Sequence, residues 1–419
     1  MGSERFSRRA RMRLCAMSGA EIVWRSPLAL RSLVQRSGFA LANWVPPATA
    51  HLPNRSGAAA RASAFAYQPV LDGWRAVSIL LVLFSHGGLD KAVPGGLGVT
   101  IFFFISGFLI TSLLISERRR DGRISLRNFY LRRFWRLAPP LICFIILSAL
   151  LIVLSLGTIK SVELLSAILY FANYYSICWQ YVALPFGPSP LKILWSLAIE
   201  EHFYLFFAPL MAFFAHTRRR LFLLVLALLV APLAIRCVVT FSQPLTLLRY
   251  EYTYMATEAR IDSIAWGALL AWLCSHFAAA KLNALLDNKT AIAASLALLL
   301  LTLLVRDEGF RESIRYSLQG IALLPLFYVT VRGRGLQPLQ AVLASPSATL
   351  IGKLSYSLYL YHWLALVIAD RVAGENRMLS ASWLLTYSVL SIGLSYGSYR
   401  LIERPSLALR KRYGSHAPG

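Results

Sequence analysis

Long apolar runs separated by short polar segments dominate the chain from residue 72 to residue 400. Most of the runs approach the roughly 20 residues that a helix needs to cross the hydrocarbon core of a bilayer. The runs lie at residues 72–89, 97–116, 137–157, 161–177, 191–214, 221–240, 260–279, 290–305, 316–331, 349–370 and 380–400. This pattern predicts an all-α fold, a polytopic transmembrane helical bundle.

Charged connections between the runs predict its topology. The segment 117–136 carries eight arginines, and the segment 217–222 contains three more. Both are expected in the cytoplasm because positively charged loops stay inside, so an even number of crossings must separate them. Three runs lie between them. We therefore expect the shortest, 161–177, either to re-enter the membrane or to lie against the bundle, which leaves about ten crossings and cytoplasmic termini.

Composition supports a membrane protein and excludes several other classes. With 57% hydrophobic residues in 419, the chain is too apolar for a soluble protein. The net charge of +24 would suggest nucleic acid in a soluble chain, but here the basic residues cluster between apolar runs, so we expect no nucleic-acid partner. The five cysteines are scattered and indicate neither a disulfide framework nor a metal site. Only seven of the 43 basic residues are lysine, which fits a GC-rich bacterial genome.

The pattern divides the chain into three parts. Residues 1–66 are basic and rich in serine and alanine, and we interpret them as a disordered arm lying on anionic lipid or as a wrongly assigned start. No continuous apolar segment follows the basic start, so a cleaved signal peptide is not expected. Residues 67–405 form the predicted transmembrane domain, and 406–419 form a cytoplasmic tail.

The first run, LDGWRAVSILLVLFSH, carries two ionisable residues, Arg75 and His86. On an α-helix, eleven steps of about 100° leave them about 20° apart on one face and roughly 16 Å apart along the axis. Ionisable side chains are costly within a membrane, so each is a functional candidate. A histidine can take a proton from a hydroxyl and return it, which suits a general base. The alternative is a histidine that only forms a hydrogen bond between helices.

Two further segments place charged residues toward the predicted outer side. Glu200 and Glu201 lie in the run WSLAIEEHFYLF, where a carboxylate could orient an imidazole or polarise an acceptor, or could face an interfacial loop. Arg260 and Asp262 lie at the outer end of another predicted helix. They are candidates for binding a polar acceptor, and the alternative is that they mark the membrane boundary.

On the inner side, Arg133 and Arg136 share a helix face at i and i+3, where they could grip a phosphate-bearing donor or anchor the helix to lipid phosphates. A late helix adds Tyr356 and His362 as candidates for substrate binding, although a histidine in such a place is more often a packing residue.

Seven segments, in this order, resemble the acyltransferase 3 family of bacterial integral membrane acyltransferases, in its single-domain form. The resemblance runs from about Gln68 to Pro405. It rests on LDGWRAVSILLVLFSH, GGLGVTIFFFISGFLI, FYLRRFWRLAPP, WSLAIEEHFYL, RIDSIAWG, SYSLYLYHW and YRLIERP. It implies transfer of an acyl group, commonly acetyl from acetyl-CoA, to a hydroxyl of a sugar, glycan or other acceptor at or beyond the outer face.

The resemblance also implies roles for matching residues. Arg75 and His86 match the R-x10-H pair of the family, and Arg133 and Arg136 match its R-x-x-R motif. We expect His86 to act as general base, a glutamate of the pair at 200 and 201 to orient it or stabilise charge, and the two arginines to clamp the phosphates of CoA. Direct transfer and an acyl-histidine intermediate both stay open. Acyl-CoA is the expected donor substrate, and no cofactor is expected to be permanently bound.

Two other functions are consistent with a polytopic chain. A transporter or flippase of a glycan or lipid-linked substrate would need no reaction, but no internal repeat of the kind common in transporters relates 72–240 to 260–400. A membrane scaffold would not explain so many ionisable residues inside apolar runs.

Overall fold

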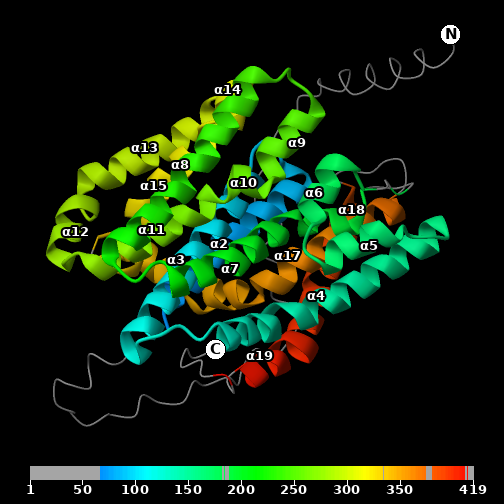
Figure 1. Ribbon diagram of the computed structural model, residues 1–419. Coiled ribbons are helices and arrows are strands. Elements are labelled where there is room, and N and C mark those ends of the chain that lie inside the picture. Colours follow the sequence, from blue (N-terminus) through cyan, green and yellow to red (C-terminus); the bar gives the residue numbers. More distant parts are fainter. Residues whose placement is uncertain are drawn as a thin grey trace. The chain divides into compact units, whose positions relative to one another are not determined.

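The computed structural model describes residues 67–181, 184, 188–333, 335–373, 380–410 and 413. These residues form helices and connecting loops, with no β-strand among them, so the all-α class is confirmed (Figure 1). The predicted N-terminal arm, 1–66, and most of the predicted tail, 406–419, lie outside the described residues.

Short helices and breaks alternate with long helices along the described chain. The helices are α2 (Pro69–Phe84), η2 (Ser85–Leu89), α3 (Gly95–Asp121), α4 (Leu126–Leu156), α5 (Ser161–Ile168), α6 (Ala172–Cys178), η3 (Pro190–Leu194), α7 (Trp195–Phe213), α8 (Arg218–Ser242), α9 (Leu247–Met255), α10 (Thr257–Arg260), α11 (Asp262–His276), α12 (Ala279–Leu286), α13 (Lys289–Leu304), α14 (Glu308–Glu312), α15 (Arg315–Val331), α16 (Gln337–Leu343), α17 (Pro346–Ala373), α18 (Ala381–Ser398), η4 (Tyr399–Glu403) and α19 (Arg404–Arg410).

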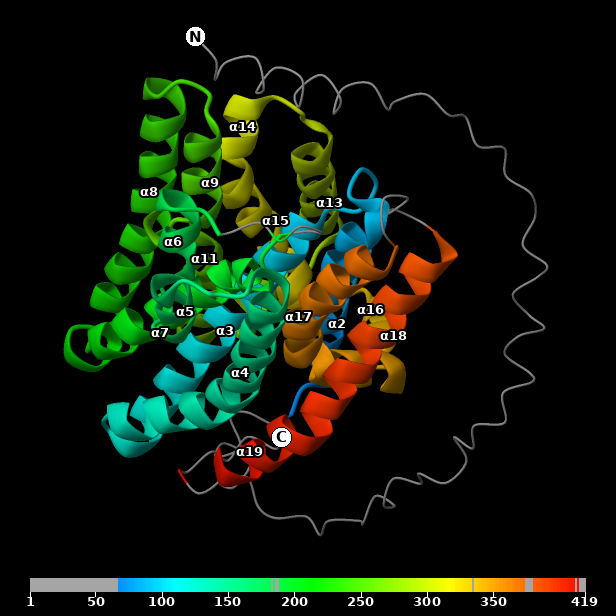
Figure 2. The same ribbon diagram turned by 90° about the vertical axis from the view of Figure 1, so that its right-hand side faces the viewer.

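Five helices make the most extensive contacts in the bundle. α3 packs against α11 and α2, and α17 packs against α2 and α18 (Figure 2). The contact between α3 and α11 depends on two glycines. A Cβ atom on Gly107 would lie 1.8 Å from the carbonyl oxygen of Ile264, and one on Gly267 would lie 1.9 Å from that of Phe104. Because small residues let helix backbones approach this closely, the two glycines fix how these helices cross.

Each of the eleven predicted apolar runs contains helix. The run 161–177 is broken into α5 and α6, and Tyr170, between them, has φ of 59°. At 1.5 Å per residue, neither helix is long enough to cross a bilayer. The segment that the charge count singled out is therefore not a continuous spanning helix. Its buried Glu163 accepts a hydrogen bond from the Ser189 hydroxyl at 2.9 Å.

Among the described residues, four helical segments are long and apolar enough to cross a membrane, and a fifth results if the bent pair α12 and α13 is counted as one span. The four are 69–89, 95–121, 126–156 and 218–242. The protein is therefore a multi-pass membrane protein, while ten crossings and cytoplasmic termini stay predictions. α7 shows why fewer helices qualify: Glu200, Glu201 and His202 interrupt its apolar sequence.

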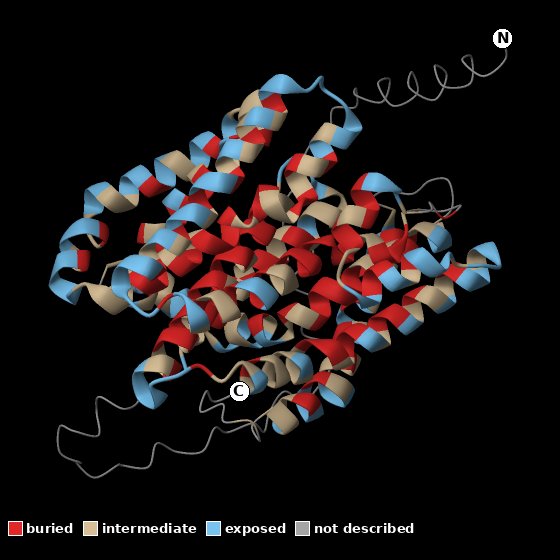
Figure 3. Cartoon of the chain, in the orientation of Figure 1, coloured by how far each residue is buried: buried red, intermediate tan, exposed pale blue. Residues whose placement is uncertain are grey.

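Large apolar side chains are exposed on the outer helices. They include Ile146, Leu154, Val230, Phe241 and Ile392. Figure 3 shows the complementary pattern, with buried residues concentrated in the central helices and exposed residues along α4, α8 and α13. Apolar side chains exposed along outer helices face lipid in a membrane protein.

Candidate active site

His86 lies in a π-helical turn at the end of α2. α2 starts with Pro69 in its first turn, where the missing N–H is harmless. It continues into η2, which contains Gly87 and Gly88 and ends at Leu89. Gly88 has φ of 95°, a conformation that favours glycine. A π turn holds more residues than an α turn, so the ideal helical spacing from Arg75 does not extend to His86. Such turns occur frequently at functional sites.

The imidazole of His86 contacts a second histidine. Its Nδ1 lies 3.1 Å from Nε2 of His362, and Nδ1 of His362 lies 2.9 Å from the carbonyl oxygen of Leu358. The two rings are nearly parallel, at 12°, and the indole of Trp363 meets His86 edge-on at 4.8 Å. α17 therefore holds the His86 ring on two sides.

His86 also lines a cavity of about 250 Å³. Residues of α2, η2, α3, η3, α7, α9 and α17 form its walls. Those with polar or aromatic side chains include His86, Lys192, Trp195, Glu251, Tyr254 and Trp363. Pockets of roughly 300–1,000 Å³ hold drug-sized ligands, so this cavity suits one small group, such as a single sugar ring.

An acidic residue, Glu251, is the unusual feature of this cavity. Its side chain is buried, with Oε1 at 3.5 Å from Nζ of Lys192, and its Oε2 has no hydrogen-bond partner among the described residues. A buried acceptor without a partner is destabilising unless a ligand or water completes it. Beside it, Tyr250 stacks on Tyr254 at 5.8 Å.

Glu200 and Glu201 lie one to two helical turns after Trp195, the residue of α7 that lines the cavity. Neither glutamate contacts His86 in the described structure. Glu200 accepts hydrogen bonds from the hydroxyls of Ser106, at 3.0 Å, and Tyr204, at 3.1 Å. Both glutamates interact electrostatically with Arg133. His362, rather than either glutamate, contacts the His86 imidazole. The sequence predicts that the glutamates lie on the same side of the membrane as His86, but it does not show toward which helix their side chains point.

The arginines of α4 belong to a cluster at the opposite end of α2. Arg136 interacts electrostatically with the like charges of Arg75, Arg133 and Arg410 and with the opposite charge of Glu403. Among the described residues, the guanidinium groups of Arg133 and Arg136 form no hydrogen bond or close ion pair. Burial, followed by neighbouring arginines, lowers the pKa of Arg410 to about 10, so this group stays charged at neutral pH.

Several neighbours hold this cluster in place. Arg75 forms an ion pair of 2.7 Å with Asp72, and Arg133 lies 4.7 Å from the centre of the Tyr204 ring. Glu403 belongs to the π-helical turn η4 and accepts a hydrogen bond of 2.7 Å from the Ser357 hydroxyl. The cluster therefore contains more positive than negative charge, as a site for a polyanion requires.

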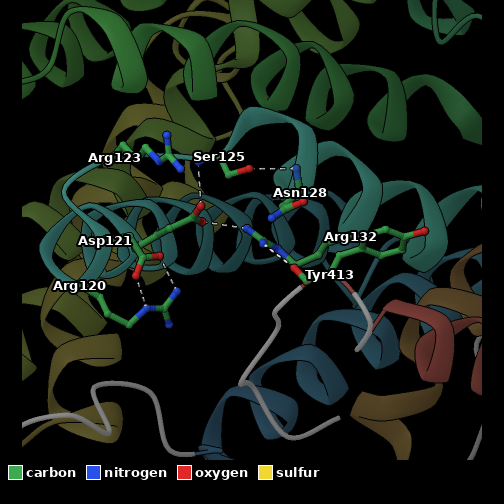
Figure 4. A pocket seen from close by; sticks show the side chains of 8 residues that line it. Arg120, Asp121, Arg123, Ser125, Asn128, Arg132 and Tyr413 are labelled. Atoms are coloured by element: carbon green, nitrogen blue, oxygen red, sulfur yellow. Dashed lines mark hydrogen bonds and ion pairs between the residues drawn. The ribbon is translucent and has the colours of Figure 1, made fainter.

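A second cavity, of about 390 Å³, lies between the end of α3 and the start of α4. Arg132 lies beside it (Figure 4). Its guanidinium forms an ion pair of 2.9 Å with Glu117 and donates a hydrogen bond of 3.1 Å to the carbonyl oxygen of Tyr413. Arg120 and Arg123 also line this cavity. Because Arg132 is one of the like charges near Arg410, the cavity adjoins the arginine cluster.

Asp262 is held by an arginine that the sequence analysis did not single out. Arg236 of α8 donates two hydrogen bonds to it, at 2.9 and 2.7 Å, and both side chains are fully buried. Arg236 also bonds to Ser317 of α15 at 2.7 Å. Asp262 therefore joins α8, α11 and α15. Arg236 is the one charged residue inside its apolar run, which is the signal that could have identified it.

Arg260 is buried and Tyr356 is half-buried, and neither residue lines the His86 cavity. The Arg260 guanidinium lies 3.5 Å from the centre of the Tyr316 ring and 5.5 Å from that of Tyr254, and its Nη2 is 3.4 Å from the Thr100 hydroxyl. It thus supports the cavity from behind Tyr254. The Tyr356 hydroxyl donates to the carbonyl oxygen of Leu137 at 2.8 Å and joins α17 to α4.

The comparison with known families identifies the chain. The profile of a family described as "Acyltransferase domain" matches residues 69–400. The chain belongs to the acyltransferase 3 family. The O-acetyltransferase OatA of Staphylococcus aureus (strains NCTC 8325 / PS 47 and COL) is 30% identical over 361 residues, covering 81% of this chain and 57% of OatA. A protein of strain MSSA476, whose O-acetyltransferase name is itself an inference, is 29% identical over 356 residues, with the same coverage.

This chain spans little more than half the length of these relatives. No solved structure matches it significantly. For the acyltransferase 3 family, the structure adds an arrangement that the motifs do not show. His86 of the first motif contacts His362 of SYSLYLYHW. Arg136, the last arginine of FYLRRFWR, lies near Glu403 of YRLIERP. The sequence analysis did not single out Lys192 and Glu251, which line the His86 cavity, or Glu403, which lies near the arginine cluster.

Proposed function

We propose that this protein is an O-acyltransferase of the bacterial cytoplasmic membrane, which moves an acyl group, acetyl in the first instance, from acyl-CoA to a hydroxyl of a sugar, glycan or other small acceptor. The observation that carries the proposal is a histidine held by a hydrogen bond at the wall of a small polar and aromatic cavity, in a chain of this family. Family membership favours an enzyme over a transporter. Ten crossings with both termini in the cytoplasm complete the proposed arrangement.

The reaction needs little activation because a thioester is already reactive. The acceptor hydroxyl oxygen forms a bond to the acyl carbon, the carbon–sulfur bond breaks, and His86 takes the hydroxyl proton and returns it to the thiolate of CoA. Positioning the two substrates and removing that proton are the main tasks of the protein. Direct transfer is the simplest route that uses a base in the position of His86.

The arginine cluster is the proposed donor site. The guanidinium groups of Arg133 and Arg136 lack hydrogen-bonding partners among the described residues, and Arg132 lines the adjoining cavity. Phosphate groups match the planar fork of an arginine, whereas an isolated cluster of like charges is unfavourable. The diphosphate and ribose phosphate of CoA would supply the missing negative charge.

Replacement of Arg133 and Arg136 by alanine together is expected to raise the KM for acyl-CoA by about 10-fold or more, because each charged hydrogen bond contributes roughly 1.5–3 kcal/mol. Arg136→Lys alone should also raise it, since lysine keeps the charge but loses the fork. The measurement is steady-state transfer at varied acyl-CoA concentration. Arg127→Ala, an exposed arginine on the same helix, is the control. An unchanged KM in the double variant would support lipid anchoring instead.

The cavity beside His86 is the proposed acceptor site. Aromatic side chains can cover the apolar face of a sugar ring, and the Glu251 carboxylate can accept a hydrogen bond from a neighbouring hydroxyl or amide. The unpartnered Oε2 of Glu251 supports this role, since a bound acceptor would complete it.

The activity can be tested with protein purified in detergent, radiolabelled acetyl-CoA and a panel of saccharides. We expect label to appear in at least one saccharide as an ester. Glu251→Gln should raise the KM for that saccharide by about 5–10-fold, because the amide oxygen replaces a charged hydrogen bond by a weaker neutral one. The KM for acetyl-CoA should not change. Glu308→Gln, at an exposed glutamate, is the matched control.

Two results would contradict these proposals separately. No label in any acceptor, from folded protein and several acyl-CoA donors, would contradict acyl transfer. Transfer by wild type with an unchanged acceptor KM in Glu251→Gln would leave the enzyme in place and remove Glu251 from the acceptor site.

A further inference from the structure

A chain of two hydrogen bonds connects the backbone of α17 to His86. The first joins Nδ1 of His362 to the carbonyl oxygen of Leu358, at 2.9 Å. A carbonyl oxygen only accepts hydrogen bonds, so the proton of this bond is on Nδ1 of His362. The second joins Nε2 of His362 to Nδ1 of His86, at 3.1 Å.

The first bond determines the direction of the second. His362 is fully buried, and no carboxylate contacts it among the described residues, so a charged imidazole there would be strongly disfavoured. A neutral imidazole with its proton on Nδ1 has a lone pair on Nε2. His362 therefore accepts the second bond, and His86 donates it from Nδ1. The remaining nitrogen of His86, Nε2, then carries the lone pair.

We propose that His362 is a positioning residue that holds His86 in the tautomer with Nδ1 protonated, so that Nε2 is the atom that takes the proton of the acceptor hydroxyl. The proposal rests on the O-acyltransferase function proposed above. Hydrolytic triads follow the same logic, because a third group bound to one imidazole nitrogen fixes which nitrogen acts as base. Here the third group is a neutral imidazole that is itself oriented by a main-chain carbonyl.

The proton balance is complete without a change in His362. As the acceptor oxygen bonds to the acyl carbon, its proton moves to Nε2 of His86, which becomes an imidazolium ion. Its Nδ1 proton stays in the bond to His362 and stabilises this charge. As the carbon–sulfur bond breaks, the Nε2 proton moves to the leaving thiolate, and His86 returns to the starting tautomer.

The surrounding side chains keep the two rings in this relation. The nearly parallel rings lie 5.3 Å apart between centroids, and Trp363 packs edge-on against His86. On the other side of His362, the Tyr359 ring lies 5.8 Å away, and its hydroxyl bonds to Ser196. His362 thus has little freedom to rotate away from His86.

Two substitutions at position 362 separate positioning from packing. In His362→Gln, the amide oxygen can lie where Nε2 lies now and can still accept the bond from His86. In His362→Asn, the shorter amide can reach only toward Leu358 and leaves His86 without an acceptor. Both variants are polar and smaller than histidine, so they are matched for burial.

We expect kcat to fall by about 10²-fold in His362→Asn and by less than about tenfold in His362→Gln, because correct base geometry contributes about 10²–10⁴-fold. KM for both substrates should stay near wild type, since His362 contacts neither. Equal losses in the two variants, or kcat of His362→Asn within threefold of wild type, would overturn the proposal. Absence of transfer by wild type would instead overturn the proposed function.

A measurement of tautomer state needs no turnover. Nitrogen-15 solid-state NMR of membrane-embedded protein labelled in histidine distinguishes protonated from unprotonated ring nitrogens, and the signals of His86 are those lost in His86→Ala. We expect Nδ1 protonated and Nε2 unprotonated in wild type and in His362→Gln, with loss of this preference in His362→Asn. A wild-type His86 protonated on Nε2 would overturn the proposal.

Discussion

Replacing His86 by alanine is expected to lower the rate of acyl transfer by about 10²–10⁴-fold, the usual contribution of a general base. The fold should tolerate the change because the imidazole already lines a cavity, so its removal enlarges an existing space rather than opening a new one in the core. The measurement is kcat of detergent-purified variant and wild type at saturating acyl-CoA and acceptor, with thermal unfolding recorded for both.

The matched control is His216→Ala, since His216 is exposed and lies between α7 and α8. That variant should keep wild-type activity. If His86→Ala transfers within threefold of wild type while folded, His86 is not the base, and the role that we assign to His362 is removed with it.

The second large effect is expected on stability. Asp262→Ala leaves the fully buried Arg236 without its counter-charge, and breaking a buried ion pair on one side costs about 3–5 kcal/mol. We expect a marked decrease in the thermal unfolding temperature and in the yield of folded protein. Replacing both members, in Arg236→Met with Asp262→Leu, should restore much of the stability because no charge is left unpaired.

An exposed pair provides the comparison. Arg120 and Asp121 are joined at 2.8 Å with roughly half of each side chain exposed, so Arg120→Ala should change stability by less than about 1 kcal/mol. If Asp262→Ala instead leaves the unfolding temperature unchanged and raises the acceptor KM, then Asp262 binds substrate, which is one of the two roles that the sequence left open.

The positions of the helices can be predicted from the sequence, because apolar runs are expected in lipid and charged connections are expected in water. Even the break in 161–177 could be expected, since two arginine-rich connections cannot be separated by three crossings. Ten crossings stay a prediction. A helix with charged residues inside its apolar sequence, such as α7, is not among the four segments that are long and apolar enough to cross a membrane.

What could not be predicted is direction around a helix and contact between distant helices. The position of Glu200 and Glu201 along the chain predicts that one of them lies beside His86, yet Glu200 accepts hydrogen bonds from Ser106 and Tyr204. The π turn at 85–89 contains one residue more than an α turn, and the spacing of apolar residues does not predict this insertion. The contact between His86 and His362 joins residues 276 positions apart, so only the tertiary structure reveals it.

The Arg236–Asp262 pair has a consequence for how the chain is made. α8 leaves the ribosome first and carries Arg236 alone, while its counter-charge follows 26 residues later in α11. An arginine within an inserting helix is costly, by up to roughly 2.5–3.5 kcal/mol at the helix centre, and Arg236 lies in the last third of α8. We therefore expect α8 to be fully stabilised in the membrane only after α11 has been synthesised and has supplied Asp262.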